Sequence, residues 1–429
     1  MADKLRLLLI SDIHYLTMAQ ETDPYYPLRK AFIRELRDYK DSVGTIDHVL
    51  VSGDIAYKGD KKEYKEAEKY FSEISYACGC PKEQFYTVPG NHDKNFNAIG
   101  YPERHLINAG LSNVSSDIDT LFCDFLERNS PVISTLYGPF ENYDNFAQGF
   151  DSIEPLTDKY VEKGASPYDH NVDKAFYKRQ LKSLGDYNVM LYGFNTALNS
   201  DWYDIDDSGK GHLLYLPKLA YNCDTDNEGY INIAMMHHPI DRLVHAEEIK
   251  KKLDKNFQVQ IYGHLHMPAS DLNGSIHIHS GAFQPPKDDG DLAGAAYFSV
   301  YNIVTLSILP FNSKCDKLKV DLTVIKFDGA DFREIDEECK SFEIEVNKVH
   351  INRFSMEQNI REVENKQGLP KNVSIRDVRI AFLRNPRYKK YIKDMSQYDD
   401  KRTRNENCIS FLKEMEDNNR LGELWKEMN

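Results

Sequence analysis

The chain has 429 residues, of which 41% are hydrophobic and 28% are charged. These fractions are close to the averages for globular domains, so they exclude a wholly disordered, collagenous or low-complexity protein. The length predicts two to three domain-sized units, and the net charge of -14 predicts a surface that repels nucleic acid and anionic membranes unless positive charge is locally concentrated.

No apolar run approaches the roughly 18 to 20 residues that a membrane-spanning helix needs. The apolar run at the N-terminus, Leu5 to Ile10, is interrupted by Arg6 and lacks a small-residue cleavage site. It is therefore typical of a strand rather than of a secretory signal. We predict a soluble, cytoplasmic protein without membrane contacts.

The first 90 residues alternate between strand and helix patterns. Apolar runs predict strands at 5–11, 47–52 and 84–88, and apolar residues at helical spacing predict helices over 28–39 and 64–74. A β-α-β-α-β opening of this kind indicates an α/β fold whose crossover helices cover the sheet.

Residues 94–185 form an irregular, aromatic-rich insertion, in which we predict helices near 117–128 and 173–184. Its aromatic side chains fit either of two roles, a small core of a lid or a surface that stacks nucleobases. After it, regular patterns resume and predict a second sheet and hence a two-sheet core. The expected strands are 187–194, 230–236, 257–262, 275–279, 297–309 and 318–327, with a helix over 244–253.

Composition changes beyond about Gly329, so we predict a core domain at 1–329 and a mainly helical C-terminal appendage at 330–429. The appendage is expected to hold a strand at 342–346, followed by three helices near 355–366, 374–395 and 405–427. Residues 371–404 carry eleven Lys or Arg against four acids. This basic segment fits a solvated helix face or a face that docks on an acidic partner better than a nucleic-acid patch, which remains the alternative.

Polar blocks follow the predicted strands of the core. Because ligands bind outside the carboxyl ends of strands in open α/β sheets, we expect these distant blocks to converge on one crevice. The blocks are Asp12-Ile13-His14, Gly53-Asp54, Gly90-Asn91-His92-Asp93, His237-His238-Pro239 and Gly263-His264-Leu265-His266.

These blocks offer imidazole nitrogens and hard oxygens but no thiolate, a set that suits Mn, Fe or Zn better than copper or a calcium cage. Taken singly, each block is ordinary polar sequence in a turn. Taken together, the seven donors predict a metal site formed by Asp12, His14, Asp54, Asn91, His237, His264 and His266.

In these five blocks, over roughly residues 5–285, the chain resembles the calcineurin-like metallophosphoesterase superfamily. The superfamily signature is Asp-x-His, Gly-Asp, Gly-Asn-His-Asp or Glu, a later His, and Gly-His-x-His. The resemblance implies an α/β fold, a two-sheet metallophosphoesterase sandwich flanked by helices, here with the aromatic-rich insertion and the mainly helical appendage.

The resemblance also implies two metal ions about 3.5 to 4 Å apart, bridged by Asp54. One ion would be held by Asp12, His14, Asp54 and His266, and the other by Asp54, Asn91, His237 and His264. A metal-bridging hydroxide would then be the nucleophile of an in-line attack on phosphorus.

Three further residues receive roles from this resemblance. His92 is expected to protonate the leaving group or stabilise its charge, and Asp93 is expected to hold the His92 ring. His237 and His238 compete for one ligand position; the family pattern favours His237, which leaves His238 near the substrate or simply packed.

The leading hypothesis is a metal-dependent phosphodiesterase acting on a nucleotide or cyclic nucleotide, because the motif combination resembles that of bacterial cyclic-nucleotide phosphodiesterases. One alternative is a DNA or RNA nuclease subunit of a larger complex, whose partner or nucleic acid would bind the appendage through 371–404. Another is a metal-binding interaction module that acts through its C-terminal helices.

Overall fold

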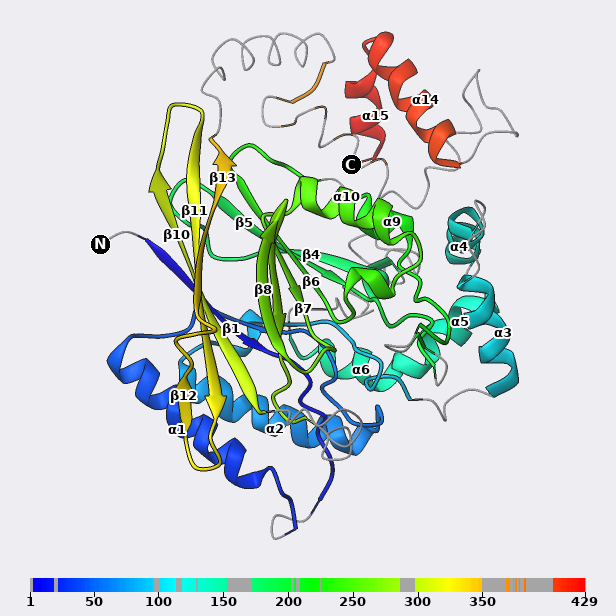
Figure 1. The fold of residues 1–429 in the computed structure, drawn as a ribbon. Helices are drawn as coiled ribbons and strands as arrows, with labels where there is room; N and C mark the ends of the chain where they lie inside the picture. Colours follow the sequence, from blue (N-terminus) through cyan, green and yellow to red (C-terminus); the bar gives the residue numbers. More distant parts are fainter. Residues whose placement is uncertain are drawn as a thin grey trace. The chain divides into compact units, whose positions relative to one another are not determined.

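The computed structural model divides into two compact units (Figure 1). The first contains the described residues through Lys348, and the second contains the described residues that follow. The structure describes residues 3–18, 22–95, 101–112, 118–128, 130–150, 152, 172–201, 204–205, 209–223, 225–285, 298–348, 368–370, 373, 375, 378, 382 and 404–428.

The first sheet of the core has seven strands in the order β12-β11-β10-β1-β2-β3, with β13 also paired to β11. β1, β2 and β3 run parallel, whereas β10 pairs with β1 in the antiparallel direction. The strands are β1 (Lys4–Ile10), β2 (His48–Val51), β3 (Phe85–Thr87), β10 (Val300–Pro310), β11 (Cys315–Phe327), β12 (Phe332–Glu334) and β13 (Lys340–Asn347).

The second sheet has six strands in the order β4-β5-β6-β7-β9-β8. Its four central strands are parallel, and the two edge strands, β4 and β8, are antiparallel to their neighbours. The strands are β4 (Phe176–Gln180), β5 (Asn188–Phe194), β6 (Tyr230–Met236), β7 (Val259–Tyr262), β8 (Pro268–Asn273) and β9 (Ser275–Ser280).

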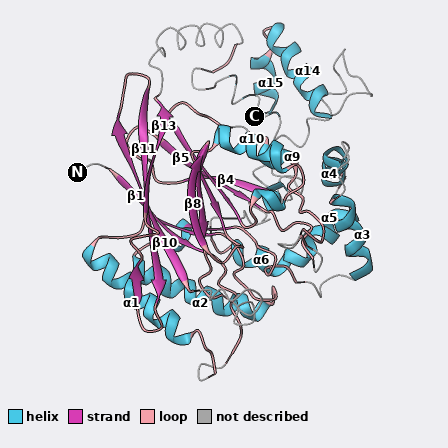
Figure 2. Cartoon of the chain, viewed as in Figure 1, coloured by secondary structure: helices cyan, strands magenta, loops and turns pink. Residues whose placement is uncertain are grey.

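Helices accompany each sheet (Figures 1 and 2). Apolar side chains of α1 (Tyr26–Ser42) and α2 (Lys61–Cys78) join a core with the first sheet, and those of α9 (Lys218–Tyr221) and α10 (Ala246–Asn256) join a core with the second. α2 begins at a capping box between Asp60 and Glu63 and ends at Gly79, whose φ of 73° is the left-handed conformation that glycine adopts without strain.

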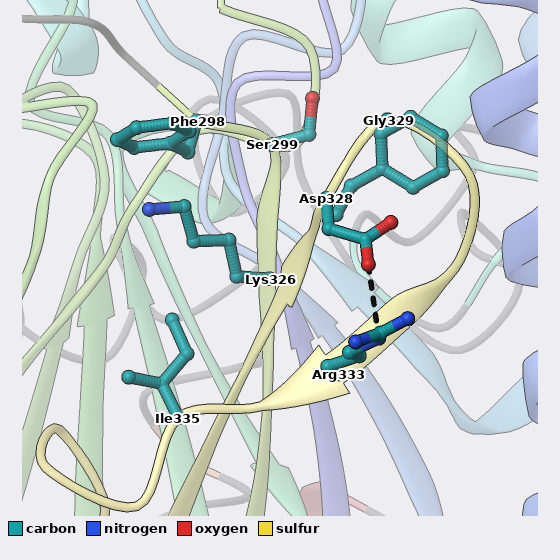
Figure 3. Close-up of a pocket in the computed structure, with 8 residues that line it drawn as sticks. Phe298, Ser299, Lys326, Asp328, Gly329, Arg333 and Ile335 are labelled. Atoms are coloured by element: carbon teal, nitrogen blue, oxygen red, sulfur yellow. Dashed lines mark ion pairs between the residues drawn. The ribbon is translucent and has the colours of Figure 1, made fainter.

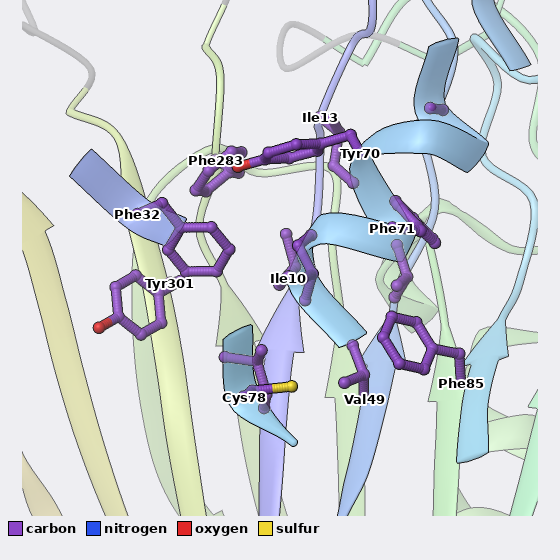
Figure 4. Close-up of a cluster of buried hydrophobic side chains, with 14 of the residues drawn as sticks. Ile10, Ile13, Phe32, Val49, Tyr70, Phe71, Cys78, Phe85, Phe283 and Tyr301 are labelled. Atoms are coloured by element: carbon purple, nitrogen blue, oxygen red, sulfur yellow. The ribbon is translucent and has the colours of Figure 1, made fainter. Parts of the chain in front are cut away.

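Alternation along β1 shows how the layers are stacked. Leu5, Leu7 and Leu9 belong to the apolar core that both sheets share, whereas Leu8 and Ile10 belong to the core with α1 and α2 (Figure 4). Because successive side chains of a strand point to opposite faces, the first sheet is buried on both sides. The layers therefore follow the order helix, sheet, sheet, helix, which confirms the predicted two-sheet sandwich.

The insertion holds the helices α3 (Tyr101–Leu111), α4 (Ile118–Glu127), α5 (Pro131–Tyr137) and α6 (Glu141–Ala147). Its aromatic residues Tyr143, Phe146 and Phe150 are buried in the core with α2, so these three have a packing role. Short 3₁₀ helices lie at Lys82–Gln84, Gly138–Phe140 and Ile240–Arg242.

The helix expected at 173–184 is wrong, because its centre is the strand β4. Tyr177 pairs in register with Gly193 of β5, and a Cβ atom at Gly193 would lie 2.3 Å from the Tyr177 ring. The glycine therefore makes room for the tyrosine ring across the strand pair. This tertiary contact overrides the helical pattern of the segment.

The sheet continues past the expected boundary at residue 329, since β12 and β13 both pair with β11. We therefore propose that the core domain ends near Lys348. In the second unit, the single helix predicted near 405–427 is two helices, α14 (Arg404–Asp417) and α15 (Leu421–Met428), and their apolar side chains form a buried cluster with Phe382.

The helix expected near 355–366 lies outside the described residues, as do most of the helix near 374–395 and of the basic segment 371–404. Among the described residues, no helix is both long enough and apolar enough to cross a membrane.

Candidate metal centre

The predicted donors lie at the carboxyl ends of parallel strands in both sheets. Asp12 and His14 follow β1, Asp54 follows β2 and Asn91 follows β3 in the first sheet. In the second sheet His237 follows β6, and His264 and His266 follow β7. The two sheets meet here directly, because Nδ1 of His237 lies 2.8 Å from the carbonyl oxygen of Ser52.

The backbone at these positions is unusual. Seven described non-glycine residues have a positive φ, and five of them are predicted ligands: Asp12 (52°), His14 (45°), Asp54 (52°), His264 (68°) and His266 (55°). Left-handed backbone costs roughly 1 to 3 kcal/mol at a non-glycine residue and concentrates at functional sites. Because these five residues share an unfavourable backbone conformation, the surrounding fold must hold their turns, and it thereby fixes the orientation of their side chains.

One group of donors comprises Asp12, His14 and His266, whose ligand atoms all lie within 4.8 Å of one another. Oδ1 of Asp12 is 3.4 Å from Nε2 of His266 and 3.9 Å from Nε2 of His14. Oδ1 of Asp12 and both ring nitrogens of His14 are buried without a hydrogen-bond partner among the described residues. Buried polar atoms normally have partners, so these orphaned atoms fit a cation.

Asp54 lies between this group and the second one. Its Oδ2 is 3.3 Å from Nε2 of His237 and 3.9 Å from Nε2 of His14, while its Oδ1 accepts a hydrogen bond of 2.8 Å from the backbone N–H of His92. Asp54 is fully buried along with Asp12. A carboxylate with imidazoles on both sides has the geometry of a bridging ligand.

The second group comprises His237, His238 and His264, again with ligand atoms within 4.8 Å. Oδ1 of Asn91 is 3.1 Å from Nε2 of His237 and 3.2 Å from Nε2 of His238. Nδ1 of His238 lies 3.0 Å from Oγ1 of Thr196. Both histidines thus turn Nε2 towards the site. Of the two, only His237 also belongs to a donor group that contains Asp54.

Electrostatics at the site is dominated by burial. Burial lowers the pKa of His14 to about 3 and that of His264 to about 4, which keeps both rings in the neutral form that binds metals. Burial also disfavours charge on His237, but the Asp54 carboxylate overrides it and raises the pKa of His237 to about 9. The buried carboxylates thus attract positive charge, and two cations would provide it.

The expectation that Asp93 holds the His92 ring is wrong. The Asp93 carboxylate accepts hydrogen bonds from the backbone N–H groups of Ile55 (3.0 Å), Ala56 (2.9 Å) and Gly90 (3.0 Å), and from the hydroxyl of Tyr64 (2.8 Å). It therefore joins the turn after β2 to the turn after β3. Burial, followed by the neighbouring charge of Asp54, raises its pKa to about 6.

His92 is held by a backbone group instead. Its Nδ1 lies 2.8 Å from the carbonyl oxygen of Tyr57. Since a carbonyl can only accept, Nδ1 carries the proton, and Nε2 is the nitrogen left for the site. The ring lies next to His14, with 4.6 Å between centroids, and its ligand nitrogen belongs to a donor group with His14 and Asp54.

Lys94 and Thr196 support the site and were not predicted. Lys94 is buried, and its Nζ donates hydrogen bonds of 2.8 Å to the carbonyl oxygens of Leu198 and Ser200. These bonds fix the loop after β5, which also carries Thr196, the partner of His238. Lys94 directly follows the Gly-Asn-His-Asp block, but nothing in the sequence indicates that its ammonium group is buried.

Two other features of the first unit contain none of the predicted donors. Asp201, Asp204 and His212 form another compact donor group, in which Nε2 of His212 lies 2.9 Å from Oδ1 of Asp201, as in an ion pair. A cavity of about 690 Å³ is lined by residues at the ends of β10, β11 and β12, among them Phe298, Lys326, and the ion pair of Asp328 with Arg333 (Figure 3). None of the predicted ligands lines this cavity.

A two-sheet sandwich that gathers aspartates, histidines and an asparagine at the carboxyl ends of its parallel strands defines a metallophosphoesterase-type protein. The family model of the calcineurin-like phosphoesterases matches residues 5–268. The chain therefore belongs to the calcineurin-like phosphoesterase family, whose members are metal-dependent phosphoester hydrolases that use two metal ions.

The chain is also similar to the uncharacterized metallophosphoesterase-like protein YydB of Bacillus subtilis, with 27% identity over 272 residues. The match covers 61% of this chain and 49% of YydB, so it spans about half the length of that relative. Among solved structures, the yellow lupin purple acid phosphatase PPD1 is 14% identical with a TM-score of 0.39, over 82% of this chain and 55% of that one. This likeness is too weak to carry an argument about function.

Proposed function

We propose that this protein is a dinuclear metal-dependent phosphohydrolase that cleaves a phosphodiester, with a nucleotide or cyclic nucleotide as the substrate class. The observation that carries the proposal is the convergence of all seven predicted donors from five separate strand ends. Several of their buried donor atoms have no hydrogen-bond partner among the described residues. The choice of a diester rests on the combination of the Asp-x-His, His-x-Pro and Gly-His-x-His blocks, which resembles that of bacterial cyclic-nucleotide phosphodiesterases.

The donors divide into two overlapping sets, as the family pattern implies. Asp12, His14, Asp54 and His266 would hold one ion, and Asp54, Asn91, His237 and His264 would hold the other. When bound, the two ions would stabilise charge on phosphoryl oxygens and lower the pKa of a coordinated water towards neutrality. The residues would fit Mn, Fe or Zn, since they are oxygen and imidazole donors.

The roles of the surrounding side chains follow from their contacts. His92, fixed by the Tyr57 carbonyl, would in its doubly protonated form present an Nε2–H group to the leaving-group oxygen and donate that proton to it. Asp93 would keep the Asp54 turn against the Gly90 turn. His238, fixed through Thr196, would lie beside Asn91 and His264 at the substrate side of the second ion.

The test combines metal analysis with a substrate panel. The purified chain, reconstituted with Mn²⁺, is assayed on a phosphodiester, a phosphomonoester, cyclic nucleotides, and single- and double-stranded DNA and RNA. We expect two ions per chain and the highest kcat/KM on a diester or cyclic nucleotide. Preferred cleavage of DNA or RNA would replace the proposal with a nuclease, and two bound ions without any turnover would favour an interaction module.

A further inference from the structure

Gln284 contacts the backbone of the Asp12 turn at two points. Its backbone N–H donates a hydrogen bond of 3.0 Å to the carbonyl oxygen of Asp12, and its side-chain Nε2 donates one to the carbonyl oxygen of Ile13. Gln284 is 1% exposed, so both bonds are shielded from water. It thus satisfies two carbonyl groups of the turn that carries Asp12 and His14.

Arg29, a buried residue of α1, holds the other end of the Gln284 side chain. Its guanidinium donates a hydrogen bond of 2.7 Å to Oε1 of Gln284 and another to Asp23, and it lies 4.8 Å from the centre of the Tyr15 ring. Because arginine can only donate, it requires the oxygen of the Gln284 amide on its own side. The N–H₂ group of that amide must then face Ile13.

We propose that Arg29, acting through Gln284, is a positioning residue that fixes the Asp12–His14 turn in its metal-binding conformation. This inference rests on the proposed function. The turn needs support because Asp12 and His14 both have a positive φ, which is unfavourable for non-glycine residues. A free Gln284 amide could rotate and turn its oxygen towards the Ile13 carbonyl, and two acceptors in contact would push the turn away.

The apolar contacts of this region are separate from the hydrogen-bond relay. This relay consists of the bond from Arg29 to Gln284 and the bonds from Gln284 to the Asp12–His14 turn. Phe283 packs in the core with Ile13 and Tyr70, and its backbone N–H donates a hydrogen bond of 2.8 Å to the Ser11 carbonyl (Figure 4). Neither contact uses a side-chain atom of Arg29 or Gln284, so a conservative replacement at either position should leave both contacts in place. We therefore expect such variants to fold and to bind metal poorly.

The experiment compares the full chain with Arg29→Lys and Gln284→Glu. Arg29→Lys keeps the positive charge beside Asp23 but loses the planar fork that contacts both partners. Gln284→Glu keeps an oxygen acceptor for Arg29 but cannot donate to the Ile13 carbonyl. The matched control is Arg34→Lys, since Arg34 lies on the same helix, is largely exposed and pairs with Asp331.

Each metal-free protein is titrated with Mn²⁺ by calorimetry, and its melting temperature is measured without metal. We expect the ion held by Asp12 and His14 to bind about 10- to 100-fold more weakly in both variants, as is usual when a supporting partner of a ligand is lost. The control should bind like the wild type. The metal-free melting curves verify that each variant is folded at the titration temperature. If Arg29→Lys is unfolded at that temperature, the metal affinity of Gln284→Glu alone tests the positioning role.

The outcomes separate this inference from the function on which it rests. Wild-type affinity for two ions in folded Arg29→Lys and Gln284→Glu would overturn the positioning role and leave the proposed metal centre intact. A wild-type chain that binds no Mn²⁺ would overturn the proposed function itself, and the relay with it.

Discussion

Gly90 lies directly against the carboxylate of Asp54: a Cβ atom at position 90 would be 2.1 Å from Oδ1 of Asp54. No side chain fits at that distance, so the turn after β3 can approach the turn after β2 only with glycine at this position. The close approach also lets the backbone N–H of His92 donate to the same oxygen. Through Gly90 and His92, the Gly-Asn-His-Asp block thus determines what contacts the carboxylate of Asp54.

Gly90→Ala should therefore displace Asp54 and abolish tight metal binding. Overpacking of this kind typically costs about 1 to 3 kcal/mol of unfolding free energy, which urea denaturation of the metal-free protein would measure. The matched control is Gly110→Ala in α3, where a Cβ atom would meet nothing within 4 Å. That change should leave metal content unaltered and stabilise the helix by about 0.5 to 1 kcal/mol. Equal metal affinity in the two variants would contradict this account of Gly90.

His92→Gln should retain both metal ions and lose catalytic rate. General acids contribute about 10²- to 10⁴-fold, so kcat on a substrate with a poor leaving group should fall within that range. A substrate with a good leaving group needs less protonation and should lose much less. Steady-state kinetics on the two substrates, with metal content measured in parallel, tests this. An equal loss on both substrates would argue against proton donation by His92.

Asp93→Asn should destabilise the fold rather than act on His92. The carboxylate accepts from three backbone N–H groups and from Tyr64, and an amide nitrogen at one of its oxygen positions would leave a buried donor unsatisfied. We expect a loss of about 1 to 3 kcal/mol in unfolding free energy, measured by urea denaturation. Tyr64→Phe removes one donor and should cost less, about 1 kcal/mol. The reverse ranking would show that the backbone contacts of Asp93 matter little.

His48 should make the protein sensitive to mild acid. It is buried, its Nε2 accepts a hydrogen bond of 2.9 Å from the backbone N–H of Lys182, and burial lowers its pKa to about 4. Because the folded pKa lies below the ordinary 6.5, its contribution to stability is complete above pH 6.5 and is lost as the pH falls towards 4. The loss corresponds to about 3 kcal/mol at about 1.4 kcal/mol per pKa unit.

The check is the unfolding free energy of wild type and His48→Gln between pH 7 and pH 4. Glutamine keeps an acceptor for the Lys182 N–H but does not titrate, so the variant should lose less stability over this range. Parallel curves for the two proteins would rule out His48 as a source of acid sensitivity.

The sequence predicted the parallel strands and the donor blocks because both depend on local patterns: buried apolar runs, each followed by a polar turn. It missed β8 (Pro268–Asn273), a mostly exposed edge strand without an apolar run, and β12, which has three residues. Such strands form because a neighbouring strand offers hydrogen bonds, which a single segment does not reveal.

The role of Asp93 was mispredicted for a related reason. Asp93 is next to His92 in sequence, but its partners Ile55 and Ala56 belong to the turn after another strand. The relay from Arg29 to Gln284 joins residues 255 positions apart, and neither residue belongs to a recognisable motif. Contacts of this range follow from the packing of the sheets and helices, so they become visible only in the structure.

The most direct test of the metal centre is the metal content of the wild type and of Asp54→Asn, measured by plasma mass spectrometry after reconstitution with Mn²⁺ and desalting. Asp204→Asn serves as the control, because it alters the Asp201, Asp204 and His212 group, which contains none of the predicted ligands. A metal centre bridged by Asp54 should hold two ions per chain in the wild type and the control, and should lose both in Asp54→Asn. Two ions retained in Asp54→Asn, or none in the wild type, would contradict it.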